Sequence, residues 1–296
     1  MIDFGKLLEE KPILFSDTAV NTSLGNWYSS SVRGSQFMAE IDIGGLEKGI
    51  AAAEWFKWWF SQSPILTTTC VVQELNRFRK RIRLKLQKLQ TKEQVYHTMH
   101  CSDYARKVEL FKLVASMYRE VYLAAREAVF RPLEPQKFGA LERAILTVSE
   151  NTDSKRDYSH RHEENPIRRP DDLRADESLV AAALYVSLVD KEPCTIVTPD
   201  SDIRRLLIAS CRLIANGEIP GGKDFYDALR EFNIRVYFAV SNGLKLDVDT
   251  QNLSFDRLFS APGLDNVGTS RVRKELIDTL ADGRLIERPE YFKVGQ

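Results

Sequence analysis

Residues 195–206 read TIVTPDSDIRRL, and this stretch decides how the fold is interpreted. An apolar run stops at a Pro-Asp turn, and a helical pattern begins directly after it. Such a run is typical of a short buried strand that leads into a helix. Asp200 and Asp202 stand at the mouth of this strand. They are either a turn residue and a helix N-cap, or part of a functional site.

Similar apolar runs alternate with helical patterns along the chain. We expect strands at 13–15, 64–69, 195–197 and 234–240, and helices at 46–60, 70–89, 103–130, from 176 and at 202–215. The aromatic helix at 46–60 is expected to be packed rather than to stack on bases. This alternation predicts an α/β fold with a mostly parallel sheet.

Four acidic residues fall where the strands of such a sheet end or the next helices begin. Asp17 and Asp200 follow strands, Glu74 lies one turn into a helix, and Asp176 opens another helix. Ligands of parallel α/β sheets bind outside the carboxyl ends of the strands, so these side chains are expected to converge. Clustered carboxylates repel one another, and a divalent ion with a preference for oxygen ligands removes the repulsion. The pattern predicts a Mg²⁺ or Mn²⁺ site.

Four segments in this order resemble the motifs of the PIN-domain nucleases. They are LFSDTAV around Asp17, CVVQELNRF around Glu74, RADESLVAAAL around Asp176 and TIVTPDSDI around Asp200. The resemblance implies a three-layer α/β/α sandwich around the parallel sheet. It also implies metal-dependent hydrolysis of RNA phosphodiester bonds.

The resemblance assigns roles to particular residues. Asp17, Glu74, Asp176 and Asp200 would be the catalytic metal ligands, Asp202 would assist them, and Ser16 and Thr198 would contact a phosphate or water. The metal ions would activate the attacking water and stabilise the leaving oxygen. Two further functions stay open: an inactive PIN-like scaffold that binds RNA or protein, and a structure-specific DNA nuclease.

The resemblance does not cover the whole chain. The expected core consists of residues 1–76 and 166–240. A long helical basic insertion with a polar loop is expected at 77–165, and a tail with one helix at 241–296. A protein partner or a second copy of the chain could bind through the insertion.

The insertion concentrates positive charge although the whole chain has a formal net charge of +0. From Arg77 to Arg131 there are 14 Lys and Arg residues against five Asp and Glu residues. A charge run is usually a solvated helix face, but this one begins three residues after Glu74, as a track for a polyanion would. We expect Arg77, Arg79, Lys80, Arg81 and Arg83 to bind an RNA substrate.

Simpler roles remain open for some of these acidic residues and for the histidines. Asp176 could be only a helix cap, and His97, His100, His160 and His162 could contribute to a zinc site, although surface histidines are the better explanation.

The four cysteines form no CxxC pair, and no apolar run is long enough for a membrane span. A cytoplasmic protein without a membrane partner is expected.

Overall fold

A computed structural model describes most of the first two hundred residues and one later hairpin. The described ranges are 13–18, 27–62, 65–96, 103–151, 174–192, 194–198, 236–242 and 245–249, with residues 203, 206, 207 and 210. Most of the predicted helix at 202–215, the polar loop beyond residue 151, all four histidines and most of the tail lie outside the described residues; positions 203, 206, 207 and 210 are helical, as predicted.

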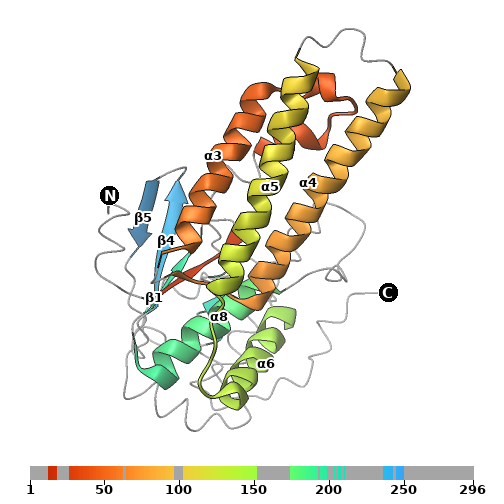
Figure 1. Ribbon diagram of the computed structural model, residues 1–296. Helices are drawn as coiled ribbons and strands as arrows, with labels where there is room; N and C mark the ends of the chain where they lie inside the picture. Colours follow the sequence, from red (N-terminus) through yellow and green to blue (C-terminus); the bar gives the residue numbers. More distant parts are fainter. Residues whose placement is uncertain are drawn as a thin grey trace, which may run out of the picture.

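The described strands form one five-stranded sheet, with helices on either side of it (Figure 1). Its strands are β1 (Ile13–Ser16), β2 (Ile65–Leu66), β3 (Cys194–Val197), β4 (Val236–Asn242) and β5 (Lys245–Asp249), in the order β2-β1-β3-β4-β5. β1 runs parallel to both β2 and β3, and β3 runs parallel to β4. Only β5 is antiparallel to its neighbour. The described residues therefore have the predicted α/β class with a mostly parallel sheet.

The strand order changes direction at β1. The chain first places β2 on one side of β1 and later returns to place β3 on the other side. The gap between the carboxyl ends of β1 and β3 is therefore a topological switch point, the place where ligands bind in sheets of this kind.

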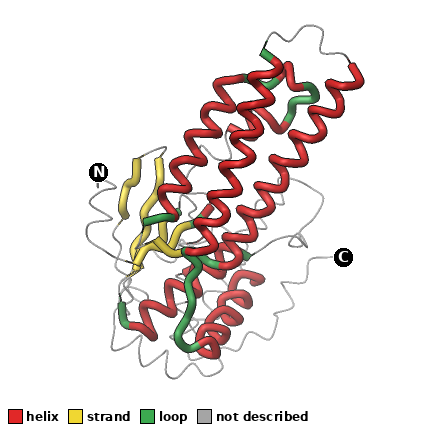
Figure 2. The backbone as a smooth tube through the Cα atoms, viewed as in Figure 1, coloured by secondary structure: helices red, strands yellow, loops and turns green. Residues whose placement is uncertain are grey.

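Helices dominate the described structure (Figure 2). The long ones are α3 (Ile43–Phe60), α4 (Thr69–Tyr96), α5 (Tyr104–Glu127), α6 (Pro135–Asn151) and α8 (Ala175–Tyr185), and the short ones are η2 (Ser29–Arg33), η3 (Met38–Glu40) and η4 (Val186–Asp190).

The two faces of the sheet are covered by different helices. Leu14 points into a cluster with side chains of α3, α4 and α5, and its neighbour Phe15 points into a second cluster with α6 and α8. This follows from the two-residue period of a strand, which sends successive side chains to opposite faces. Both residues are completely buried, so helices pack on both sides of β1.

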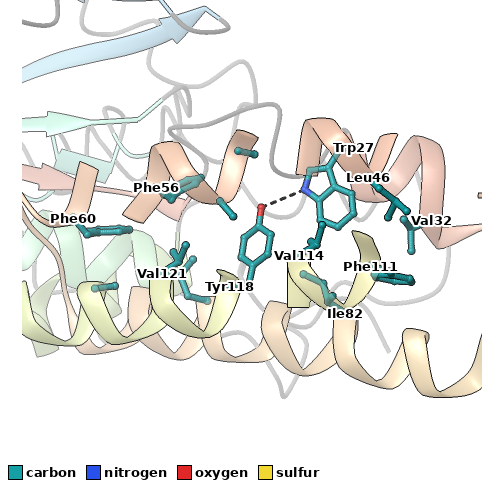
Figure 3. Packing of buried hydrophobic residues seen from close by; sticks show 14 of the residues in the cluster. Trp27, Val32, Leu46, Phe56, Phe60, Ile82, Phe111, Val114, Tyr118 and Val121 are labelled. Carbon is teal, nitrogen blue, oxygen red and sulfur yellow. Dashed lines mark hydrogen bonds between the residues drawn. The ribbon is translucent and has the colours of Figure 1, made fainter. Parts of the chain in front are cut away.

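The first cluster continues away from the sheet between three long helices. Figure 3 shows Phe56 and Phe60 at one end and Val32, Leu46 and Phe111 at the other. Trp27 donates its indole N–H to the Tyr118 hydroxyl, 3.2 Å away, in the middle of this core. The predicted aromatic helix is thus a packed helix, although Trp58 remains 43% exposed.

Several predicted boundaries differ from the observed elements. The strand expected at 64–69 is shorter, as β2, and the helix expected at 70–89 is longer, as α4. α4 is continuous through position 76, because its buried side chains repeat at helical spacing on both sides of this point. The sheet also extends to Asp249, beyond the predicted end of the core at residue 240, because β5 pairs with β4. The division into a core and an insertion stays a prediction.

Candidate active site

Asp17 lies directly after β1, at the switch point of the sheet. Its backbone N–H donates to the carbonyl of Val197 at 3.2 Å, which extends the β1–β3 pairing by one residue. Thr198, the residue after β3, donates its hydroxyl to Oδ2 of Asp17 at 2.9 Å. The ends of the two central strands are therefore joined through a carboxylate that the sequence motif singles out.

Thr18 links Asp17 to the second predicted acid. Its hydroxyl lies 2.9 Å from Oε2 of Glu74 and 3.3 Å from Oδ1 of Asp17. A hydroxyl has one proton to donate, and an ionised carboxylate can only accept. One proton is thus shared between two carboxylates that come from β1 and α4. The sequence reading missed this role, although Thr18 is part of the quoted LFSDTAV motif.

Burial makes this arrangement sensitive to lost hydrogen bonds. Asp17 is only 4% exposed and Thr198 is 1% exposed. A carboxylate with so little contact with water is costly unless other groups stabilise its charge. The Thr198 hydroxyl does this for Oδ2 of Asp17, and the Thr18 hydroxyl, which Asp17 shares with Glu74, lies 3.3 Å from Oδ1.

Ser16 has a supporting role on the other side of the backbone. Its hydroxyl accepts a hydrogen bond from the indole N–H of Trp59 at 2.7 Å and is completely buried. The Thr67 hydroxyl donates to the Ser16 carbonyl at 3.1 Å, which ties β1 to the segment after β2. These contacts hold the chain in place beneath Asp17. The substrate contact predicted for Ser16 stays a prediction.

The N-terminus of α8 lies against the N-terminus of α4. Ser178 and Thr68 share a hydroxyl–hydroxyl hydrogen bond of 2.5 Å, and Ser178 donates to the carbonyl of Ala175 at 2.8 Å. Asp176 is partly exposed in this first turn, where a negative charge interacts favourably with the helix dipole. It is not the N-cap, because Arg174 occupies that position with a left-handed backbone at φ 57°.

A neighbouring acid was missed by the sequence reading. Glu177 follows Asp176 and is completely buried, whereas Asp176 is not. α8 is buried around most of its circumference, so the alternation of apolar and polar residues gave no signal for which acid points inward.

Cys70 lies close to the same region and is not suited to act as a nucleophile. Burial is the main cause that raises its thiol pKa, and the charges of Glu142 and Glu74 raise it further. A hydrogen bond with Ser178 and the charge of Arg174 act in the opposite direction without reversing the shift. The thiol stays protonated at neutral pH, and the thiolate is the reactive form.

The described part of the edge supplies oxygen donors but not a complete metal site. Within the described ranges, no three His, Cys, Asp or Glu side chains form a group that could hold a metal ion. Asp17 and Glu74 are brought together through Thr18, while Asp200 and Asp202 lie outside the described residues. The predicted ligand set as a whole therefore stays a prediction.

The predicted basic residues lie on α4, which begins beside this edge. Arg79 donates to Oδ1 of Asn76 at 2.8 Å, and its guanidinium lies 4.6 Å from the centre of the Tyr122 ring of α5. This cation–π contact turns Arg79 towards a neighbouring helix. By contrast, Lys80, Arg81 and Arg83 are exposed, and Arg77 is partly exposed.

No protein-family model matches the chain, and no curated protein and no solved structure matches it either. In the part of the chain that the structure describes, every helix is too short or too polar to cross a membrane.

Proposed function

We propose that the protein is a metal-dependent endoribonuclease with a PIN-like α/β/α fold. The observation that carries the proposal is the pair of carboxylates at the switch point, where Thr198 and Thr18 position Asp17 and Thr18 also contacts Glu74. The described donors at this edge are oxygen atoms of carboxylates and hydroxyls. This donor chemistry fits Mg²⁺ or Mn²⁺.

The metal ligands would come from four elements of the sequence. Asp17 follows β1, Glu74 lies in the second turn of α4, and Asp176 lies in the first turn of α8. Asp200 would complete the set from the segment after β3, assisted by Asp202. When bound, divalent ions at such a site activate water and stabilise charge on the phosphate.

The chain's own residues have distinct tasks in this proposal. Thr198 holds Oδ2 of Asp17, and the hydroxyl of Thr18 keeps Asp17 and Glu74 in a fixed relative position. Preorganisation of this kind matters because ligands that shift by even about 1 Å lose much of their effect on a reaction. The carboxylates orient the reacting groups, and the basic residues of α4 attract the polyanionic substrate.

Cleavage of a labelled, mixed-sequence single-stranded RNA tests the proposal. The wild type is incubated with Mn²⁺, with Mg²⁺ and with EDTA, beside Asp17→Asn and the control Asp103→Asn. Asp103 is exposed, and its side chain makes no capping hydrogen bond to α5, so the same chemical change there should be silent. We expect cutting that needs a metal and is lost only in Asp17→Asn.

Two other results would point to the alternatives. Metal-dependent cutting of DNA flaps but not of RNA would replace the ribonuclease with a DNA nuclease. RNA binding without cutting under any metal condition would contradict enzymatic activity and leave a binding scaffold.

A further inference from the structure

One face of α4 carries a row of basic residues that begins next to Glu74. The row is formed by Arg77, Arg81, Lys85, Lys88 and Lys92, and we call it the α4 basic stripe. Its members follow Glu74 at steps of three or four, which places all of them on one side of the helix. At a rise of about 1.5 Å per residue, the stripe extends about 27 Å from Glu74 to Lys92.

The charges of the stripe lie close enough to influence one another. Burial is the main cause that lowers the pKa of Lys85, and the positive charges of Lys92 and Lys88 lower it further. Glu40 is the acid that counteracts this effect. Arg81, Lys88 and Lys92 form no ion pair with another described residue. The stripe is thus a region of concentrated positive charge that an anionic partner would neutralise.

A neighbouring segment is fixed against the stripe and adds to it. The Lys85 ammonium donates to the carbonyls of Arg33 and Ser35, at 3.1 and 2.7 Å. The side chain of Arg33 is exposed. Burial raises the pKa of the Tyr28 hydroxyl, and the positive charges of Arg81 and Arg33 partly counteract this effect. Arg33 therefore lies beside the stripe, on a segment that Lys85 holds in position.

Two aromatic rings accompany these charges. The Lys92 ammonium lies 5.8 Å from the centre of the Phe37 ring, and the Tyr28 ring lies against Phe78 of α4, with ring centres 5.4 Å apart. Both rings are partly exposed. Positive charge that follows a backbone, together with aromatic rings on which bases stack, is the combination that binds single-stranded nucleic acids.

We propose that a single strand of nucleic acid lies along the α4 basic stripe, with its phosphates on the basic side chains and unpaired bases against Tyr28 and Phe37. This inference rests on the proposed function, because it treats the stripe as the path by which the strand reaches Asp17 and Glu74. At about 3.4 Å per nucleotide of a stacked strand, the stripe accommodates at most about eight nucleotides. Arg79 is excluded from the path because it lies against Tyr122.

Binding measured without metal tests the stripe separately from cleavage. Fluorescence anisotropy in EDTA follows a labelled 12-nucleotide RNA, the DNA of the same sequence and an RNA duplex, at several salt concentrations. The stripe variant changes Arg81, Lys88 and Lys92 to Gln, and the control changes Lys48, Lys112 and Arg119 to Gln. All six residues are exposed, so both variants should fold, which thermal melting verifies. Lys85 is kept because it holds backbone carbonyls.

The stripe variant should bind single strands at least about tenfold more weakly at 50 mM salt. Its slope of log K against log salt should be smaller by about 2, since each lost phosphate contact removes about 0.7. The control variant should bind as the wild type does. Equal losses in both variants, or no loss in the stripe variant, would overturn the proposal. Tighter binding of the duplex than of either single strand would do so as well.

Two further variants test the path more finely. Tyr28→Leu should weaken binding about tenfold without changing the salt slope, because stacking involves no counterion release. An unchanged affinity would remove the ring from the proposal. Lys80→Gln with Arg83→Gln should have little effect, since these residues lie off the stripe, and a loss as large as that of the stripe variant would contradict a defined path.

The binding and cleavage assays together distinguish a failure of the stripe proposal from a failure of the nuclease proposal. Stripe-dependent binding without metal-dependent cutting would retain the stripe and contradict the nuclease. Cutting by a stripe variant at the wild-type rate, with unchanged affinity, would retain the nuclease and contradict the stripe.

Discussion

Thr198→Val tests whether the hydroxyl at the end of β3 stabilises the Asp17 carboxylate. The substitution preserves the shape of the side chain and removes a 2.9 Å hydrogen bond to Oδ2 of Asp17. A hydrogen bond to a charged group contributes about 1.5–3 kcal/mol, and burial of both residues favours the upper part of this range. For a domain of this size, about 2–4 °C per kcal/mol gives a fall in Tm of roughly 3–12 °C.

The assay compares thermal unfolding and cleavage in four proteins. The wild type and Thr198→Val are measured with Asp17→Asn and with the double variant, which completes a double-mutant cycle. If the bond is made to a charge, Thr198→Val should destabilise the Asp17→Asn protein by about 1 kcal/mol less than the wild type. Cleavage by Thr198→Val should fall by about 10- to 100-fold, as for groups that orient metal ligands.

Thr91→Val is the matched control, because Thr91 is exposed and its hydroxyl bonds only to a helix carbonyl. We expect a change below about 0.5 kcal/mol there. A Tm of Thr198→Val within 1 °C of the wild type, with unchanged cleavage, would refute the role given to this hydroxyl.

Three further predictions concern the helical core. Tyr118→Phe should destabilise the protein by about 1–3 kcal/mol in urea unfolding, because the buried Trp27 N–H loses its acceptor; an unchanged midpoint would contradict this. Burial raises the pKa of Tyr118 well above its usual range. The free energy of unfolding should therefore be unaffected by this group below about pH 10 and should fall as the pH rises further, because only the unfolded chain can then ionise its tyrosine. Tyr118→Phe should remove part of this alkaline loss. Gly49→Ala should destabilise by about 1–3 kcal/mol, because the added Cβ would lie 2.9 Å from the Trp27 ring; a stabilising effect would show that the ring can move.

The parallel sheet was predictable because its strands have strong local signals. Short apolar runs that end at turns marked β1, β3 and β4, and the observed strands begin and end within two residues of the expected ones for β1 and β3. β5 was missed because the pattern after Ser241 was read as a tail. The signal was nevertheless present: Asn242-Gly243 is a hairpin dipeptide, and Leu246 and Val248 alternate with polar residues after it.

The packing of the helices was harder to predict. The apolar spacing of α4 and α5 indicates two amphipathic helices but does not say what they pack against. α5 packs against both α3 and α4, and contacts such as Trp27 with Tyr118 connect residues far apart in the sequence. No local pattern encodes such contacts.

In the candidate site, too, the positions of individual residues were predictable from local sequence, whereas the hydrogen bonds between distant residues were not. Asp17 was predicted from its position after a strand, and its neighbour Thr18 is part of the same motif. The bond from Thr18 to Glu74 and the bond from Thr198 to Asp17 depend on how the sheet and α4 are arranged. The same arrangement buries Ser16 against Trp59, which the sequence alone did not indicate.

Titration with Mn²⁺, followed by the electron paramagnetic resonance signal of the free ion, tests most directly whether Asp17 and Glu74 hold a divalent metal. The titration compares the wild type with Asp17→Asn, Glu74→Gln and the control Asp103→Asn. We predict saturable binding in the wild type and the control, with affinity at least about tenfold weaker in both site variants. Equal binding in all four proteins, or none in the wild type, would contradict the assignment of this edge of the sheet as a metal site.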